Sequence, residues 1–181
     1  MKKLLIPALL SALLAACSTT PLPEDSNGAP VESRSGATTG VAPVKAGGLD
    51  ASGLPRELTD PSSKLSQRSI YFDLDKYEVR DDYKDLVAAH AKYLVANKGF
   101  KVLIQGNTDE RGSREYNLSL GQKRAEAVKR SLSLLGVQEA QIESVSLGEE
   151  KPKNAGHDEA AWSENRRADI LYKAADGRGE F

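Results

Sequence analysis

The sequence has a single cysteine among its 181 residues, so no disulfide can form within the chain. Its two histidines, His90 and His157, are far apart, no His/Cys cluster has the spacing of a metal site, and no glycine-rich phosphate loop occurs. The formal net charge is only −1, which argues against a nucleic-acid-binding protein. After the N-terminus no apolar run reaches the ~20 residues of a membrane-spanning helix. We therefore expect no cofactor, no metal and no nucleic-acid partner.

A catalytic set is also missing from the sequence. The neighbouring carboxylates of Glu149-Glu150 and Asp109-Glu110 allow acid–base work on a glycan in principle. Adjacent acidic residues in a loop are better explained as a solvated turn, and no serine has a local base partner. These observations predict that the protein is not an enzyme.

The N-terminus has the features of an export signal. Lys2 and Lys3 precede an apolar core and two small residues, which predicts a secretory signal peptide over residues 1–16. The sequence Leu-Ala-Ala-Cys that ends at Cys17 resembles the bacterial lipobox, which implies cleavage before Cys17 and acylation of that cysteine. Several acyl chains on one residue anchor a protein durably, whereas one chain binds a membrane only marginally. The alternative is ordinary secretion with a free thiol.

Residues 17–64 are predicted to form the lipidated N-terminus and a flexible linker. The segment is rich in Ser, Thr, Pro, Gly and Ala, and contains no aromatic residue. Such a composition buries too little apolar surface to offset the entropy of ordering. We expect a disordered tether whose typical span is about 35–40 Å.

A folded domain is predicted over residues 65–174, followed by a short, loose polar tail over residues 175–181. Apolar periodicity and capping residues place strands at 69–72, 100–105, 142–147 and 168–172, and helices at 80–97, 116–135 and 157–165. This order, β-α-β-α-β-(short α)-β, indicates an α+β domain with a mixed sheet and helices on one face. His90 falls on the apolar stripe of the first helix and is interpreted as a packed core residue.

The stretch Gln105–Arg124 is the strongest candidate for a functional site. It begins at the end of an apolar strand, continues as a charged loop with glycines at 106 and 112, and enters an amphipathic helix. Asp109 near the strand end and Arg124 on the helix are suited to opposite poles of one pocket, for a ligand with an ammonium and a carboxylate. The alternative is a structural Asp109–Arg124 ion pair.

The same stretch resembles a known family when it is taken with Tyr71–Tyr77, Gly156–Trp162 and Asn165–Ala168. These motifs are similar to those of the peptidoglycan-associated lipoproteins of the Tol–Pal system and, more broadly, of the OmpA-like domain. The resemblance spans residues 69–172. Asn107 stands where many members have His.

The resemblance implies an OmpA-like β/α/β/α/β-β two-layer sandwich that binds peptidoglycan non-covalently through the diaminopimelate of the stem peptide. Asp109 would receive the ammonium of this ligand, and Arg124 would pair with its carboxylate in two-pronged geometry. Leu74 and Asp75 would form the facing wall. The binding loop would add Thr108, Glu110 and Arg111, whereas Arg166 and Arg167 would be structural or rim residues.

The resemblance also implies location and partners. It predicts a lipoprotein held in the outer membrane at Cys17, with its domain facing the periplasm and linking that membrane to the cell wall during envelope maintenance and division. The expected protein partners are TolB and other Tol-system proteins. The alternative function is an envelope adaptor whose main ligand is TolB rather than the wall.

Overall fold

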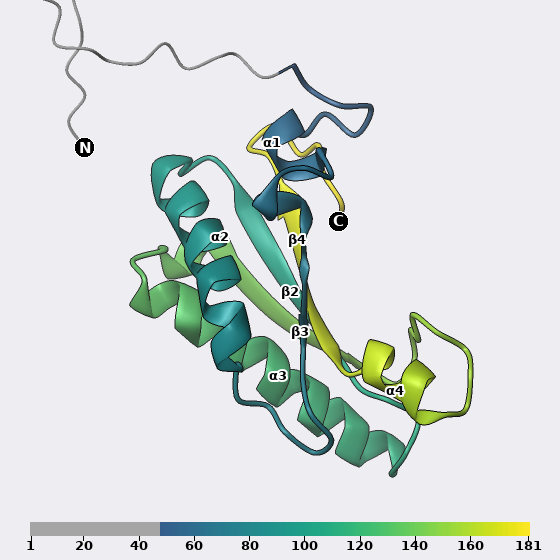
Figure 1. Cartoon of the computed structure of the whole chain (residues 1–181). Helices are drawn as coiled ribbons and strands as arrows, with labels where there is room; N and C mark the ends of the chain where they lie inside the picture. Colours follow the sequence, from purple (N-terminus) through teal and green to yellow (C-terminus); the bar gives the residue numbers. More distant parts are fainter. Residues whose placement is uncertain (1–47) are drawn as a thin grey trace, which may run out of the picture. The chain divides into compact units, whose positions relative to one another are not determined.

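The computed structural model describes residues 48–181 (Figure 1). The predicted signal peptide, Cys17 and most of the predicted tether lie outside the described residues. Among the residues that are described, no helix is both long and apolar enough to cross a membrane.

The domain is built on a four-stranded mixed sheet in the order β1-β4-β2-β3. The strands are β1 (Ser69–Tyr71), β2 (Lys101–Asn107), β3 (Ile142–Gly148) and β4 (Arg167–Lys173). β4 runs antiparallel to both β1 and β2, whereas β2 and β3 are parallel. The predicted α+β class and mixed sheet are confirmed.

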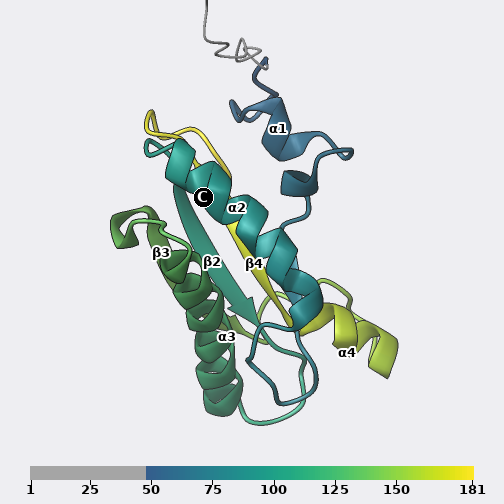
Figure 2. The ribbon, with the colours of Figure 1, turned by 60° about the vertical axis from the view of Figure 1, so that its left-hand side comes forward.

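Two long helices, α2 (Lys84–Ala96) and α3 (Arg114–Leu134), cover one face of this sheet (Figure 2). Alternate strand residues such as Val102, Ile104 and Ile170 are fully buried and meet the apolar stripes of the helices. The shorter helical segments are α1 (Arg56–Thr59), η1 (Lys64–Ser66), η2 (Asp81–Tyr83), η3 (Glu139–Gln141) and α4 (Glu159–Asn165).

The folded domain begins earlier than the sequence indicates. Leu54 and Leu58 are buried in the hydrophobic core, and the carbonyl of Leu58 accepts a hydrogen bond of 2.5 Å from Arg68 Nη2. The prediction that the flexible linker extends to residue 64 is therefore wrong for this segment. Leu54 just before α1 and Leu58 within it lie four residues apart, a spacing signal that the surrounding Ser, Gly and Pro residues obscured.

The C-terminal tail is also held to the domain. Gly179 bridges to Lys173 at the end of β4, and the backbone of Glu180 donates to the carbonyl of Tyr172 at 2.9 Å. The Glu180 carboxylate accepts from the Tyr172 backbone at 2.8 Å and pairs with Arg68. The expectation of a loose tail is wrong because these contacts continue the pairing of β4.

Glycines bring α3 unusually close to β2. A Cβ at Gly106 would lie 1.8 Å from the carbonyl oxygen of Gly121, and a Cβ at Gly121 would lie 2.3 Å from Ser146 Oγ. Gly106 therefore lies within β2 and lets α3 approach this strand closely, whereas the sequence indicated that Gly106 forms a turn. The contact fixes α3 near the end of β2, one turn before Arg124.

Candidate functional site

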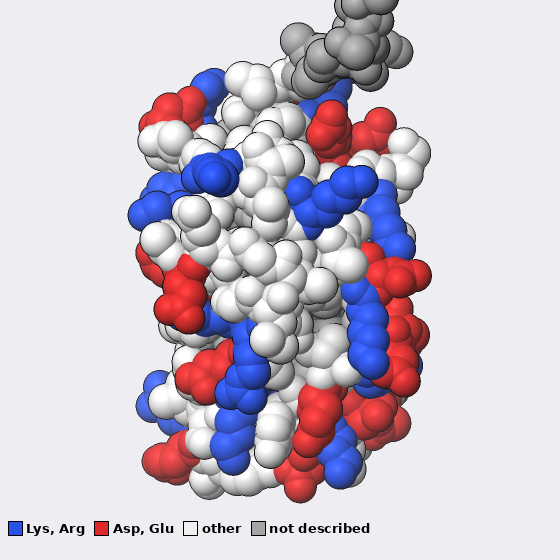
Figure 3. All heavy atoms as spheres, turned by 90° about the vertical axis from the view of Figure 1, so that its left-hand side faces the viewer, with Lys and Arg blue, Asp and Glu red and all other residues white. Residues whose placement is uncertain are grey.

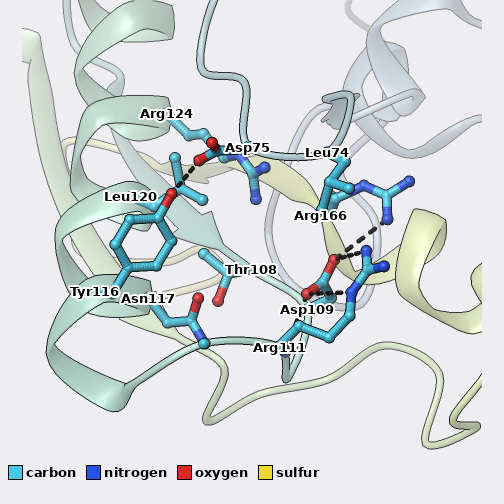
Figure 4. Close-up of a pocket in the computed structure, with 11 residues that line it drawn as sticks. Leu74, Asp75, Thr108, Asp109, Arg111, Tyr116, Asn117, Leu120, Arg124 and Arg166 are labelled. Atoms are coloured by element: carbon cyan, nitrogen blue, oxygen red, sulfur yellow. Dashed lines mark hydrogen bonds and ion pairs between the residues drawn. The ribbon is translucent and has the colours of Figure 1, made fainter.

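A cavity of about 290 Å³ lies between the loop that follows β1, the loop that joins β2 to α3, and α3 itself (Figure 4). It is lined by Leu74, Asp75, Thr108, Asp109, Arg111, Gly112, Tyr116, Asn117, Leu120, Arg124 and Arg166. Six of the seven residues predicted from sequence for the pocket are among them, and Glu110 is the exception. The two segments that carry these six residues are more than thirty residues apart in sequence.

A second hollow, of about 590 Å³, runs between α2 and α3 and has mostly apolar walls that include Val87, Ala127 and Leu134. Figure 3 shows this face of the molecule, on which a band of uncharged atoms lies between charged side chains. In the described part of the chain, the buried side-chain atoms without a hydrogen-bond partner belong to Asn107, Thr108 and Gln141, and none of these residues lines this groove. Thr108 lines the smaller cavity instead, which makes that cavity the better candidate for a polar ligand.

Arg124 is fully buried and donates three hydrogen bonds, all to backbone carbonyls. Its Nε bonds to Lys76 O at 2.9 Å, its Nη1 to Asn107 O at 2.9 Å and its Nη2 to Asp73 O at 3.2 Å. A guanidinium has five N–H donors, so two remain, one on each terminal nitrogen. A carboxylate takes up two such donors when it binds a guanidinium through two hydrogen bonds.

The charge of Arg124 has no ion-pair partner among the residues from 48 to 181. Burial lowers the pKa of Arg124 to about 10, although the field of Asp109 raises it, so the side chain stays protonated at neutral pH. Burying a cation without a partner costs free energy, and a ligand carboxylate that pairs with Arg124 lowers that cost. The alternative of a structural Asp109–Arg124 ion pair is wrong, because Asp109 pairs with other arginines.

Asp109 is nearly buried, and its carboxylate lies between Arg111 and Arg166. Arg111 Nη2 bonds to Oδ2 at 2.7 Å and its Nε to Oδ1 at 3.2 Å, while Arg166 Nη1 reaches Oδ2 at 3.2 Å. Burial raises the pKa of Asp109, but the hydrogen bonds from Arg111 and Arg166 outweigh it and hold the pKa below its usual value. Asp109 is therefore an anion at neutral pH.

Asp75 is the second carboxylate of the cavity, and it is exposed. Its backbone has φ 58°, a left-handed conformation that is uncommon for residues other than glycine and that an Asp tolerates better than most. The hydroxyl of Tyr116 on α3 donates to Asp75 Oδ1, which ties the loop after β1 to the helix (Figure 4). Leu74 beside it is 55% exposed, so the cavity has an apolar wall at its mouth.

The loop between β2 and α3 brings polar groups to the cavity floor. Thr108 is buried and donates its backbone N–H to Gly148 O at 2.8 Å, while its Oγ1 has no partner among the described residues. Gly112 turns the chain at φ 115°, and Ser113 then caps α3 by accepting from Tyr116 N at 3.2 Å. Asn117 lies inside the first turns of α3 and bonds to Glu149.

Glu110 lies outside the cavity, in a cluster with residues of the segment around α4. Its carboxylate accepts from Trp162 Nε1 at 2.9 Å and lies 2.8 Å from His157 Nδ1. These bonds to Trp162 and His157 lower the pKa of Glu110. Glu110 thus connects the loop between β2 and α3 to the chain before β4.

Sequence reasoning missed Tyr116 and Leu120 as cavity residues and treated Arg166 as structural or at the rim. Tyr116 and Leu120 precede Arg124 by eight and four residues, so helical spacing places all three on one face of α3. That spacing was a usable signal. For Arg166, which packs beside the cavity through three separate hydrogen bonds, no local pattern gave a signal.

Comparison with known proteins agrees with this architecture. A sequence profile described as the OmpA family matches residues 71–166. The peptidoglycan-associated lipoprotein of Pasteurella multocida is 54% identical over 110 residues, which cover 60% of this chain and 73% of the relative. That of Pseudomonas aeruginosa is 40% identical over 135 residues, which cover 75% of this chain and 80% of the relative.

Solved structures give the same result. The crystal structure of the peptidoglycan-associated lipoprotein from Burkholderia pseudomallei is 62% identical, has a TM-score of 0.64, and covers 65% of this chain and 99% of that one. The C-terminal domain of Helicobacter pylori MotB shares the fold at 20% identity, with a TM-score of 0.55 and coverage of 59% of this chain and 84% of that one. The chain therefore belongs to the OmpA family and, within it, to the peptidoglycan-associated lipoproteins.

Proposed function

We propose that this protein binds peptidoglycan non-covalently, by holding the diaminopimelate side chain of the stem peptide in the 290 Å³ cavity. The observation that carries the proposal is the buried guanidinium of Arg124, which keeps one free N–H on each terminal nitrogen beside two carboxylates. The free end of diaminopimelate carries an ammonium and a carboxylate on one carbon.

In this proposal Arg124 receives the ligand carboxylate through two parallel hydrogen bonds. The ammonium lies on the side of Asp109 and Asp75. Leu74 and Leu120 pack against the methylene groups of the side chain. Binding needs no nucleophile and no general base, so the protein acts by holding its ligand rather than by turning it over.

The N-terminal segment would attach this wall-binding domain to the outer membrane. Acylation of Cys17 would hold one end of the chain in the outer membrane, and the residues that follow would span the gap to the wall. Individual contacts can then be weak, because many tethered copies on one polymer gain from effective concentration. The protein would thereby link outer membrane and wall within the Tol–Pal system and support envelope integrity and division.

A protein partner at the same surface is the second candidate function. Leu74 is 55% exposed and Tyr116 is 47% exposed at the mouth of the cavity, and such apolar groups suit a protein interface. We infer, with support from the family, that TolB docks here and competes with the wall. In that case the domain is an envelope adaptor as well as a wall anchor.

Co-sedimentation with purified sacculi tests the wall-binding proposal. Arg124→Met and Asp109→Asn should each leave the protein in the supernatant, whereas Arg130→Met, at an exposed position farther along the same helix, should sediment like the wild type. Thermal unfolding of each variant shows whether the fold is retained. If both folded pocket variants still sediment fully, the pocket is assigned to the wrong place.

A separate titration distinguishes the two candidates. Muropeptides should shift NMR signals of residues around the cavity, and added TolB should reverse those shifts. Shifts with TolB and none with muropeptides would favour the adaptor function.

A further inference from the structure

The carboxylate of Asp109 has no free acceptor position in the structure. Oδ1 accepts from the backbone N–H of Arg111 at 3.1 Å and from its Nε at 3.2 Å. Oδ2 accepts from Arg111 Nη2 at 2.7 Å and from Arg166 Nη1 at 3.2 Å. A carboxylate offers about four acceptor sites, so all are taken before any ligand arrives. An ammonium can bond to Asp109 only if a resident donor leaves.

The two resident arginines differ in how easily they can leave. The Arg166 side chain is only 7% exposed, and its other nitrogens are held by Phe72 O at 3.2 Å and Glu159 Oε1 at 2.6 Å. The Arg111 side chain is 33% exposed and approaches the cavity from the loop side (Figure 4). Arg111 is therefore the movable cation, and its departure opens one position on each carboxylate oxygen.

Arg111 also contacts two residues other than Asp109. Its guanidinium carbon lies 4.1 Å from the centre of the Trp162 ring, and its Nη1 lies 3.5 Å from Glu159 Oε2. A small rotation can break the two bonds to Asp109 and still keep the ring contact and the charge of Glu159. The displaced guanidinium thus stays stabilised, which keeps the cost of displacement moderate.

We propose that Arg111 is a built-in competitor for the ammonium subsite, and that the ligand binds by displacing its guanidinium from Asp109 onto Trp162 and Glu159. This inference rests on the proposed function and adds to it a residue that sets affinity and selectivity. Ligands that lack a cation do not compete with Arg111 for Asp109, so Arg111 lowers the affinity only for ligands that carry an ammonium. The exchange of one cation for another keeps Asp109 neutralised throughout.

Calorimetric titration of the purified protein with the tripeptide L-Ala-γ-D-Glu-meso-diaminopimelate tests the inference. Arg111→Gln should bind the tripeptide about tenfold more tightly than the wild type, since the competitor is gone. Arg111→Lys keeps the charge but loses the two-pronged contact, so we expect a gain of about threefold. A tripeptide acetylated on the side-chain amine should show no gain with either variant.

Arg114→Gln is the matched control. It removes the same charge from a side chain that is 76% exposed and pairs with Glu150, away from Asp109, so the affinity should change less than about twofold. Equal or weaker binding of the tripeptide by both Arg111 variants would overturn the inference while wild-type binding still supports the proposed function. If neither the wild type nor the variants bind, both the inference and the proposed function fail.

Discussion

Replacing Arg124 by lysine tests whether the fork geometry of the guanidinium, rather than its charge, recognises the ligand. The native side chain uses three nitrogens to reach three carbonyls, at 2.9 Å for Lys76 and Asn107 and 3.2 Å for Asp73, and still keeps two donors. A lysine ammonium has three donors on one atom and cannot serve both tasks. The variant must lose either hydrogen bonds to the backbone carbonyls or the paired contact with the ligand carboxylate.

The size of the effect follows from these bonds. A hydrogen bond to a charged group contributes about 1.5–3 kcal/mol, so losing one net bond to the ligand lowers affinity about 10- to 150-fold. A buried carbonyl left without a donor costs about 1–3 kcal/mol, so stability should fall by a similar amount. Tripeptide titration measures the first quantity and urea denaturation the second. Arg130→Lys, farther along the same helix, is the control.

Wild-type affinity in a folded Arg124→Lys protein would refute this reasoning. It would mean that charge alone attracts the ligand, or that the carboxylate binds elsewhere. A loss of affinity that is matched by unfolding would instead locate the defect in the loop that Arg124 holds.

Three further predictions concern stability and are measured by urea denaturation. Gly106→Ala should destabilise the domain by about 3 kcal/mol because the added Cβ overlaps the Gly121 carbonyl. Gly99→Ala, whose added Cβ would have its nearest contact at 3.6 Å, should be tolerated. Equal destabilisation by the two substitutions would contradict the close approach of α3 to β2. Leu58→Ala should lower the free energy of unfolding by about 2–4 kcal/mol because the segment before residue 65 belongs to the core. A change near zero would instead support the predicted start of the domain at residue 65. Burial lowers the pKa of His90 from 6.5 to about 4, so the stability that neutral His90 contributes is present above pH 6.5 and is lost as pH falls toward 4. Between pH 7 and 4.5, the free energy of unfolding of the wild type should therefore fall by about 2–3 kcal/mol more than that of His90→Gln. Equal losses in the two proteins would contradict this.

The elements of the fold were largely predictable because their signals are local. Apolar spacing placed α2, α3 and α4 within a few residues of their observed bounds. The caps were less predictable: Ser113 caps α3, and Asp158 caps α4 by accepting from Ala161 N at 2.8 Å. His90 was predicted as a packed core residue and is fully buried between Tyr172 Oη and Gln67 O, at 2.8 Å from each. The errors fell where packing overrides composition, at Leu54 and Leu58 and in the tail.

The sequence by itself determined that Asp109 and Arg124 lie near one another, since a strand end, a glycine turn and a helix stripe are enough to bring both to one region. Only the tertiary structure decided how the charges are paired. Asp109 is neutralised by Arg111 and Arg166, while Arg124 is held by carbonyls and keeps two donors free. Pairing depends on the direction of each side chain and on which carbonyls it meets, and those contacts come from segments up to 57 residues apart. Composition and spacing carry no record of such directions.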